Sequence, residues 1–519
     1  MIIESMKRST NFNLMVGMWL LLILPLTLTA QAPQVQTASG VVEGYRSNGL
    51  DIFKGIPFAA PPVGELRWKA PQPVAPWNAV RKCTAFGPSP VQNPPVPFMF
   101  WSREFLIPAE PISEDCLYLN VWTPERKTKK PVLVYIYGGG FRSGGSACPI
   151  YDGEAMAKKG IVFVSINYRV GLFGFLAHPE LSAESGHGSS GNYALLDMIA
   201  ALKWVKENIA AFGGDPSRVT IAGQSAGAFA VNFLCASPLA KGLFSGAIAQ
   251  SGGSILPSPI RPRINGQQAE AMGLDLEREL GVSGIAALRA LPADRILSAK
   301  AGLMGPFDDG HVIRNGIAQT YREGNQNDVP LILGWNKDDR ISGPPMKASA
   351  YQESVRKRFG QEADRFLTLY PGNTDEEAAR SQSDMSRDET FAIQGWAWAR
   401  HQQLKGKSPV YLYNFDRALP AYSKETAFGA FHSAEIVYAY DNLHTLDRPW
   451  ETADQKLASA MSAYWLNFIR TGKPGGAGMA EWPAFRNNDQ RIMILDEQVH
   501  AVTAPARARM EWWESFFTR

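Results

Sequence analysis

A serine between glycines, in the stretch GQSAG at residues 223–227, is the strongest chemical signal in the sequence. It follows a β-branched run at 218–223 and precedes a run with helical character. In a nucleophile elbow, a tight turn from strand to helix exposes a serine hydroxyl, and flanking glycines let the strand and the helix approach each other. The pentapeptide is common by chance, but its setting here is more specific. The sequence therefore predicts that Ser225 is a nucleophile.

A serine nucleophile creates an oxyanion that needs preorganised hydrogen-bond donors. The stretch YGGGF at 137–141 follows an apolar run, and its glycines leave backbone N–H groups able to face a substrate oxygen. We expect the N–H groups of Gly139, Gly140 and Ala226 to form this oxyanion hole. The alternative is a flexible glycine loop with no part in catalysis.

A general base must take the proton of the serine hydroxyl, and seven histidines compete for that role. In folds with a nucleophile elbow, the acid and the histidine follow the serine along the chain, which excludes His178 and His187. Five histidines remain: His311, His401, His432, His444 and His500. Of these, His432 follows a strand-like run at 410–415 and has small neighbours that leave room for a moving imidazole. We therefore select His432.

Apolar β-branched runs alternate with helical patterns through the middle of the chain. Buried strands are predicted at residues 131–137, 161–168, 218–223, 246–251, 329–335 and 410–415. The run at 192–212 has apolar residues three or four positions apart, as in a helix. This alternation predicts an α/β fold whose largely parallel sheet is covered on both faces. Residues 340–405 have a mostly helical pattern, and we expect them to pack over the sheet within the same domain.

The composition indicates an ordinary globular protein. Apolar residues make up 45% of the 519 residues and charged residues 19%, so disorder is not expected. The chain has 52 Lys and Arg against 49 Asp and Glu, and it lacks the dense basic run that follows nucleic-acid phosphates. Nucleic-acid binding is therefore not expected.

The N-terminus has the pattern of an export signal. Lys7 and Arg8 precede an apolar run at 14–28, and a small-residue triplet follows at 30–32. We expect residues 1–32 to be a signal peptide, 33–519 to be a single domain, and the mature protein to be secreted or periplasmic without stable insertion in a membrane. The alternative is an uncleaved membrane anchor, for which the apolar run is short.

The motifs, taken in order, resemble the type-B carboxylesterases, the family that includes bacterial para-nitrobenzyl esterases and the cholinesterases. The resemblance covers about residues 40–515. The matching stretches are GIPFAAPPVGELRW (55–68), SEDCLYLNVW (113–122), YGGGF, NYRVGLFGF (167–175), the segment 204–228, GAFHSAE (429–435) and YWLNFIRTGKP (464–474). The resemblance implies an α/β-hydrolase fold, with a large, mostly parallel central sheet flanked by helices and a helical insertion over the active site.

The resemblance also implies a Ser-acid-His triad, with no metal and no organic cofactor. It assigns the same residues that the sequence pattern indicates: Ser225 as nucleophile, His432 as base, and the N–H groups of Gly139, Gly140 and Ala226 as oxyanion donors. The acid departs from the family pattern, because GWNKDDR (334–340) has Asp339 where relatives have Glu and Arg340 where they have Gly. Adjacent residues of an extended chain point to opposite sides, so only one of Asp338 and Asp339 can face the histidine. We favour Asp339, with Arg340 as a competing partner for its carboxylate.

Two residues near the expected site bear on substrate charge. Gln224 stands where most relatives have Glu, and the change should weaken attraction for a cationic alcohol. Arg142, just after the oxyanion loop, could favour an anionic substrate; the alternative is a solvated surface arginine.

The resemblance implies a disulfide between Cys83 and Cys116. The bridge would close a loop that could line the wall of the active site, or whose aromatics could simply pack together. That loop contains Phe98, Phe100 and Trp101. Cys148 and Cys235 are expected to be unpaired and buried.

The sequence thus predicts an exported serine hydrolase that cleaves small-molecule carboxylic esters through an acyl-enzyme, with Ser225, His432 and Asp339 as its triad. The rival hypothesis is a non-catalytic binding protein on the same scaffold, as in the neuroligin-like relatives, which typically lack an intact triad. The sequence leaves the oligomeric state and the identity of the ester open.

Overall fold

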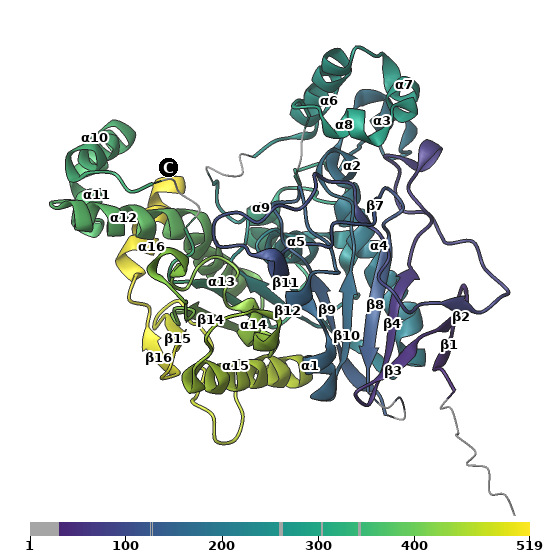
Figure 1. Cartoon of the computed structure of the whole chain (residues 1–519). Coiled ribbons are helices and arrows are strands. Elements are labelled where there is room, and N and C mark those ends of the chain that lie inside the picture. The colour runs from purple at the N-terminus through teal and green to yellow at the C-terminus, as the bar shows by residue number, and fades with distance from the viewer. Residues whose placement is uncertain are drawn as a thin grey trace, which may run out of the picture. The chain divides into compact units, whose positions relative to one another are not determined.

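The computed structural model describes residues 31–124, 126, 128–258, 263–302, 305–340 and 344–518, and within these residues eleven strands form one mixed sheet (Figure 1). The strand order is β16-β15-β14-β13-β12-β11-β9-β10-β8-β4-β3. The strands are β3 (Tyr45–Ser47), β4 (Leu50–Pro57), β8 (Tyr118–Thr123), β9 (Lys130–Ile136), β10 (Val162–Ile166), β11 (Gly214–Gln224), β12 (Gly246–Gln250), β13 (Leu331–Asn336), β14 (Val410–Phe415), β15 (Arg491–Leu495) and β16 (His500–Thr503).

The middle of the sheet is parallel and its two edges are antiparallel. The strands from β10 to β15 pair in parallel, whereas β8, β4 and β3 at one edge and β16 at the other run antiparallel to their neighbours. The six runs predicted from the sequence are the six strands β9 to β14. Apart from the first residues of β11, these strands are almost wholly buried on both faces, which explains their mostly apolar character. Two small sheets lie beside the main one, formed by β1 (Gln34–Thr37), β2 (Gly40–Glu43) and β5 (Arg81–Lys82), and by β6 (Ser89–Pro90) and β7 (Ile112–Ser113).

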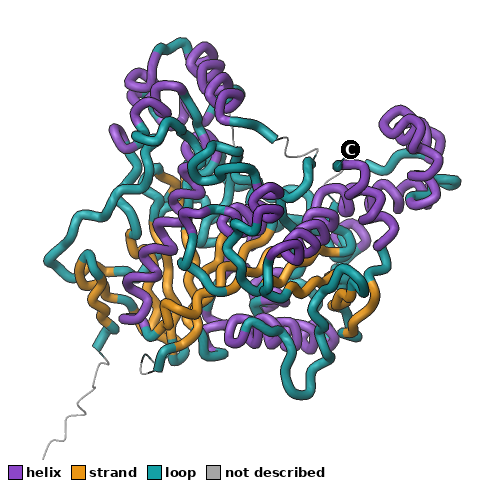
Figure 2. The backbone as a smooth tube through the Cα atoms, turned by 180° about the vertical axis from the view of Figure 1, so that it is seen from behind, coloured by secondary structure: helices purple, strands orange, loops and turns teal. Residues whose placement is uncertain are grey.

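Helices cover both faces of the sheet (Figures 1 and 2). One face is covered by α1 (Glu154–Lys158) and α15 (Thr452–Thr471), and the opposite face by α4 (Tyr193–Asn208), α5 (Ala226–Ala236) and α13 (Ile393–Lys405). Helix α9 (Ile317–Glu323) packs against α5 and α13. All residues of α5 are buried, as expected for a helix that is apolar all round. Shorter helices are α2 (Gly171–Phe175), α3 (Pro179–Glu184) and α14 (Ile436–Ala439), and α16 (Arg507–Phe517) ends the described chain.

Two groups of helices are inserted after the carboxyl ends of parallel strands. The first follows β12 and consists of α6 (Gly266–Leu280), α7 (Gly284–Ala290) and α8 (Ala293–Leu297). The second follows β13 and consists of α10 (Ala348–Phe359), α11 (Ala363–Leu369) and α12 (Asp375–Arg387), before α13. The second group confirms the helical pattern predicted for residues 340–405. Because ligands bind at the carboxyl edge of open parallel sheets, both insertions lie where a site is expected.

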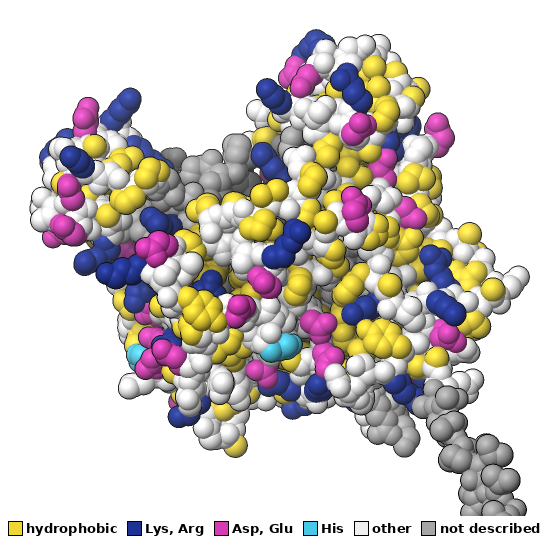
Figure 3. Space-filling model, viewed as in Figure 1, with side chains coloured by type: hydrophobic (Ala, Val, Ile, Leu, Met, Phe, Trp, Pro, Cys, Tyr) yellow, Lys and Arg dark blue, Asp and Glu magenta, His cyan; other side chains and the backbone are white. Residues whose placement is uncertain are grey.

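The described surface and helices bear on two further expectations. Figure 3 shows Lys and Arg side chains interspersed with Asp and Glu over one face of the protein, in keeping with the formal net charge of +3. Among the described helices, none is long and apolar enough to span a bilayer. From Pro33 onward the chain forms one compact unit. The apolar run at 14–28, on which the predicted signal peptide depends, lies outside the described residues.

Candidate active site

Ser225 lies at the turn between β11 and α5. Its backbone has φ 54° and ψ −123°, a conformation that side-chain-bearing residues rarely adopt. Two backbone hydrogen bonds hold it there: Ser225 N donates to Gln250 O (2.8 Å), and Ser225 O accepts from Phe229 N (2.9 Å). A strained residue held by its surroundings is a common feature of functional sites.

The glycines on either side of Ser225 allow close packing of α5 on the sheet. A Cβ atom at Gly227 would lie 2.0 Å from Ile136 O of β9, and one at Gly223 would lie 2.4 Å from the carbonyl carbon of Gly227. Any side chain at these positions would therefore force strand and helix apart. This close approach of α5 to β9 and β11 is the physical reason for the Gly-x-Ser-x-Gly spacing.

His432 and Asp339 form a buried pair in which His432 Nδ1 lies 2.5 Å from Asp339 Oδ1. The other carboxylate oxygen of Asp339 accepts hydrogen bonds from Ser251 Oγ (2.6 Å) and Asn336 N (3.1 Å). Asp338 points elsewhere and accepts from Ala430 N (2.8 Å), while Arg340 is exposed. The structure thus places Asp339, rather than Asp338, against the histidine.

The hydrogen bonds of His432 indicate where its proton lies. Because a carboxylate oxygen accepts, Nδ1 donates to Asp339, and the neutral ring keeps a lone pair on Nε2. This Nε2 lies 3.3 Å from Nε2 of Gln224, the residue that precedes Ser225. Since an amide nitrogen can only donate, this lone pair accepts from the Gln224 amide, and the contact places the base nitrogen of His432 beside the elbow.

Ser225 and His432 line a single cavity of about 570 Å³, together with Gly139, Gly140 and Ala226. Gly139 and Gly140 have φ of +119° and +64°, so this loop takes a path that other residues disfavour. The sequence-predicted nucleophile, base and oxyanion residues are therefore brought together at one cavity. The other six histidines are not among the described residues that line it.

Aromatic side chains form part of the cavity wall. Phe98 and Trp101 line it, whereas Phe100 packs behind, with its ring centroid 4.3 Å from that of Trp101. Phe391, which sequence reasoning does not find, stacks on the His432 ring with centroids 4.6 Å apart. It belongs to a π-helical segment, Asp388–Ala392, in the second helical insertion, and such segments often occur at functional sites.

The predicted disulfide between Cys83 and Cys116 is contradicted, because both cysteines are free and buried. Their chain segments pair at different places: Cys83 O accepts from Lys54 N of β4, whereas Leu117 O, next to Cys116, accepts from Phe58 N, just beyond the end of β4. Burial raises the pKa of Cys83 to about 11 and the pKa of Cys116 well above its ordinary value, so both thiols stay protonated at neutral pH. The other two cysteines, Cys148 and Cys235, are free and buried as expected.

Buried polar residues surround the His432–Asp339 pair, and sequence reasoning does not find them. Four matter most: Gln250, Ser251, Asn336 and Glu435. Gln250 Nε2 donates to Glu435 Oε1 (3.2 Å), and Asn336 Nδ2 donates to Glu435 Oε2 (2.5 Å). Gln250 and Asn336 end strands β12 and β13. A polar side chain at the carboxyl end of an apolar parallel strand is the signal that points to them.

Glu435 places a second carboxyl group close to the pair. Burial and, next, the Asp339 carboxylate raise the pKa of Glu435 to about 7. Glu435 is therefore mostly neutral in acid and ionises as the pH rises through about 7. At higher pH a second negative charge is therefore buried beside the Asp339 carboxylate.

We expect Glu435→Gln to change how the free energy of unfolding depends on pH, because the variant cannot gain this charge. A carboxyl group whose pKa is raised in the folded state makes the protein less stable as the pH rises from about 4.5 to about 7. In Glu435→Gln this loss of stability should disappear.

The measurement is urea unfolding between pH 4 and 9, with Glu425→Gln, at an exposed position, as the matched control. If the free energy of unfolding of Glu435→Gln falls with pH over this range as much as that of the wild type, the raised pKa of Glu435 is wrong.

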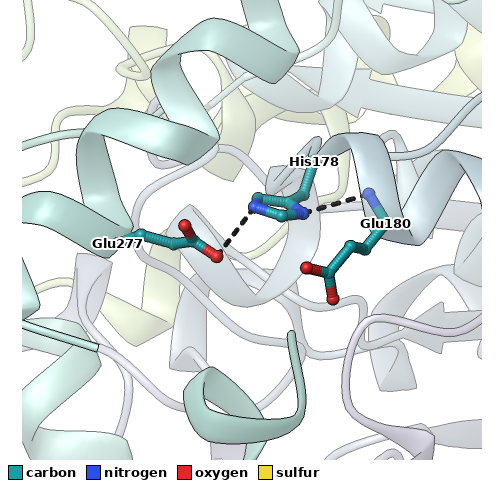
Figure 4. A group of neighbouring side chains, drawn as sticks. All are labelled: His178, Glu180 and Glu277. Atoms are coloured by element: carbon teal, nitrogen blue, oxygen red, sulfur yellow. Dashed lines mark hydrogen bonds and ion pairs between the residues drawn. The ribbon is translucent and has the colours of Figure 1, made fainter. Parts of the chain in front are cut away.

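A second group of titratable side chains lies away from the cavity, at His178, Glu180 and Glu277, whose donor atoms are within 4.8 Å of one another (Figure 4). His178 Nδ1 accepts from Glu180 N (3.2 Å), so the proton of the neutral ring is on Nε2, 3.1 Å from Glu277 Oε1. A protonated nitrogen has no lone pair for a metal. The two carboxylates also accept from the first N–H groups of α7, Gly284 N (2.6 Å) and Ile285 N (2.9 Å). We assign this cluster the structural role of joining α3, α6 and α7.

The fold and the site together define an α/β hydrolase: the elbow serine, the buried histidine pair and the glycine loop all meet at the carboxyl edge of a mostly parallel sheet. The chain belongs to the carboxylesterase family, whose sequence profile matches residues 31–513. It is a carboxylic ester hydrolase, and the resemblance noted in the sequence is confirmed.

Named relatives have esterase activities. The chain is 37% identical over 506 residues to a fumonisin B1 esterase of Sphingopyxis macrogoltabida. The alignment covers 92% of this chain and 89% of that protein. It is 34% identical to the para-nitrobenzyl esterase of Bacillus subtilis (strain 168), over 90% of this chain and 95% of that one. A solved structure of a PNB esterase matches with a TM-score of 0.79 at 30% identity, covering 93% of this chain and 99% of that chain. These relatives favour ester hydrolysis over a non-catalytic binding role.

Proposed function

We propose that the protein is an exported serine hydrolase that cleaves small-molecule carboxylic esters through an acyl-enzyme, with Ser225, His432 and Asp339 as its triad. The observation that carries the proposal is the His432–Asp339 hydrogen bond, because it leaves the lone pair of Nε2 beside the elbow, in the cavity that Ser225 lines.

In the acylation half-reaction, Ser225 Oγ attacks the ester carbonyl carbon while His432 Nε2 takes the hydroxyl proton. Asp339 keeps the ring oriented and stabilises the imidazolium that forms. The N–H groups of Gly139, Gly140 and Ala226 stabilise the oxyanion. His432 then gives its proton to the leaving alcohol oxygen, the carbon–oxygen bond breaks, and the acyl group remains on Ser225.

In the deacylation half-reaction, His432 takes a proton from water, whose oxygen attacks the acyl carbon. The same donors stabilise the second oxyanion, and the proton returns to Ser225 Oγ as the carboxylic acid leaves. The aromatic wall that includes Phe98, Trp101 and Phe391 suits hydrophobic parts of an ester.

Export is the second part of the proposal, and it rests on the sequence alone. The charged start, the apolar run at 14–28 and the small triplet at 30–32 support a signal peptide that ends near residue 32, with the mature enzyme in the periplasm or secreted.

One experiment tests both parts: the full chain is expressed in a Gram-negative host, and the cell fractions are treated with a fluorophosphonate probe. We expect the periplasmic fraction to contain a labelled protein whose N-terminus lies near residue 33 and whose labelled peptide contains Ser225. Failure to label, as expected of a binding protein, would overturn the hydrolase mechanism. A labelled cytosolic protein that begins at Met1 would overturn export alone.

A further inference from the structure

The active-site cavity contains one permanent charge. Among the described residues that line it, Arg142 is the only Lys, Arg, Asp or Glu. Its side chain is exposed, and among the described side chains none forms an ion pair or hydrogen bond with its guanidinium. A guanidinium group always carries its charge and presents donors in a fork that matches a carboxylate.

The position of Arg142 is set by the oxyanion loop. Arg142 N donates to Gly139 O (3.0 Å), so the turn that bears the expected oxyanion donors also bears this cation. Arg142 is therefore two residues along the chain from Gly140, whose N–H group is expected to face the carbonyl oxygen of a bound ester.

The rest of the cavity does not cancel this charge. Gln224 is neutral, whereas the sequence resemblance predicts Glu at this position. Its side chain contacts His432. The remaining wall is largely apolar, with Phe105, Ile107 and Phe229 among its members. A low-dielectric wall with one sign of charge attracts ligands of the opposite sign more strongly than bulk water would permit.

We propose that the cavity selects esters that carry a free carboxylate, such as monoesters of dicarboxylic acids, and that Arg142 pairs with that carboxylate. The inference rests on the proposed ester hydrolysis by Ser225, and it adds the chemical class of the substrate. Bidentate pairing would orient the ester as well as attract it.

The test compares two esters that share a leaving group and have similar acyl length: para-nitrophenyl hemisuccinate, which is anionic, and para-nitrophenyl butyrate, which is neutral. The readout is the ratio of the two kcat/KM values. We expect Arg142→Gln to lower this ratio by about 5- to 50-fold, mainly by raising KM for the hemisuccinate. A change of this size lies between the effect of an exposed ion pair and that of a charge-assisted hydrogen bond.

Two variants serve as controls. Arg142→Lys keeps the charge and should retain part of the ratio, whereas Arg142→Glu should lower it below the ratio of Arg142→Gln. The wild-type ratio should also fall as salt is added. A ratio that Arg142→Gln leaves unchanged, even if both rates fall, would overturn the proposal.

The experiment distinguishes a failure of the proposed substrate class from a failure of the proposed mechanism. If the wild-type protein cleaves neither ester, or if cleavage survives Ser225→Ala, the proposed function fails. If both esters are cleaved by Ser225 with a ratio independent of residue 142, only the substrate class fails.

Discussion

Ser225→Ala is expected to lower kcat on a para-nitrophenyl ester by at least about 10⁴-fold, because the nucleophile that accepts the acyl group is gone while the oxyanion hole and cavity remain. The strained turn does not depend on the hydroxyl, since backbone bonds to Gln250 and Phe229 hold it. The midpoint of thermal unfolding should therefore stay within a few degrees of the wild-type value. Steady-state kinetics and circular dichroism measure the two effects.

Ser237→Ala is the matched control, because Ser237 is a buried serine at the opposite end of α5, where its Oγ accepts from Leu239 N. Its loss should leave kcat close to the wild-type value. Near-normal turnover by Ser225→Ala would remove Ser225 from the mechanism.

Asp339→Asn should lower kcat by about 10³- to 10⁴-fold, since the carboxylate that orients His432 and stabilises its charged form becomes a neutral amide. The amide can also present N–H to Nδ1, which would favour the wrong tautomer of the ring. Asp339 is not among the described residues that line the cavity, so the substitution leaves the cavity wall unchanged, and KM should change much less than kcat.

Asp338→Asn is the control for this prediction. Asp338 Oδ2 accepts from Ala430 N near the histidine loop, and the carbonyl oxygen of an asparagine can do the same. We expect a loss of less than about tenfold. A larger loss in Asp338→Asn than in Asp339→Asn would show that the acid is assigned to the wrong carboxylate.

The parts of the fold that are predictable from sequence are those with a local signal. Strands β9 to β14 are buried on both faces over most of their length, so each contains a continuous, mostly apolar run. The antiparallel edges are missed because their pattern is weaker: β4 contains a register shift between Phe53 and Ile56, and β16 has partly exposed residues. The elbow is predictable because the spacing of Gly223 and Gly227 follows directly from strand–helix contact.

The parts of the site that are not predictable depend on segments far apart in the chain. Ser251, Asn336 and Glu435 come from three different segments, and their contacts with one another or with Asp339 exist only after folding. The disulfide failed for a related reason. The resemblance alone implies it, whereas in the folded chain both cysteines are free, and the backbones of Cys83 and of Leu117, next to Cys116, pair with residues four positions apart, Lys54 and Phe58.

The most direct test of the central claim is to trap the acyl-enzyme during turnover. The protein is mixed with excess para-nitrophenyl acetate, quenched with acid on the millisecond scale, digested and analysed by peptide mass spectrometry. We predict a burst of nitrophenol equal to the enzyme concentration, and one acetyl group on the peptide that contains Ser225. Release of nitrophenol with Ser225 unmodified, or with the acetyl group on another residue, would contradict the account.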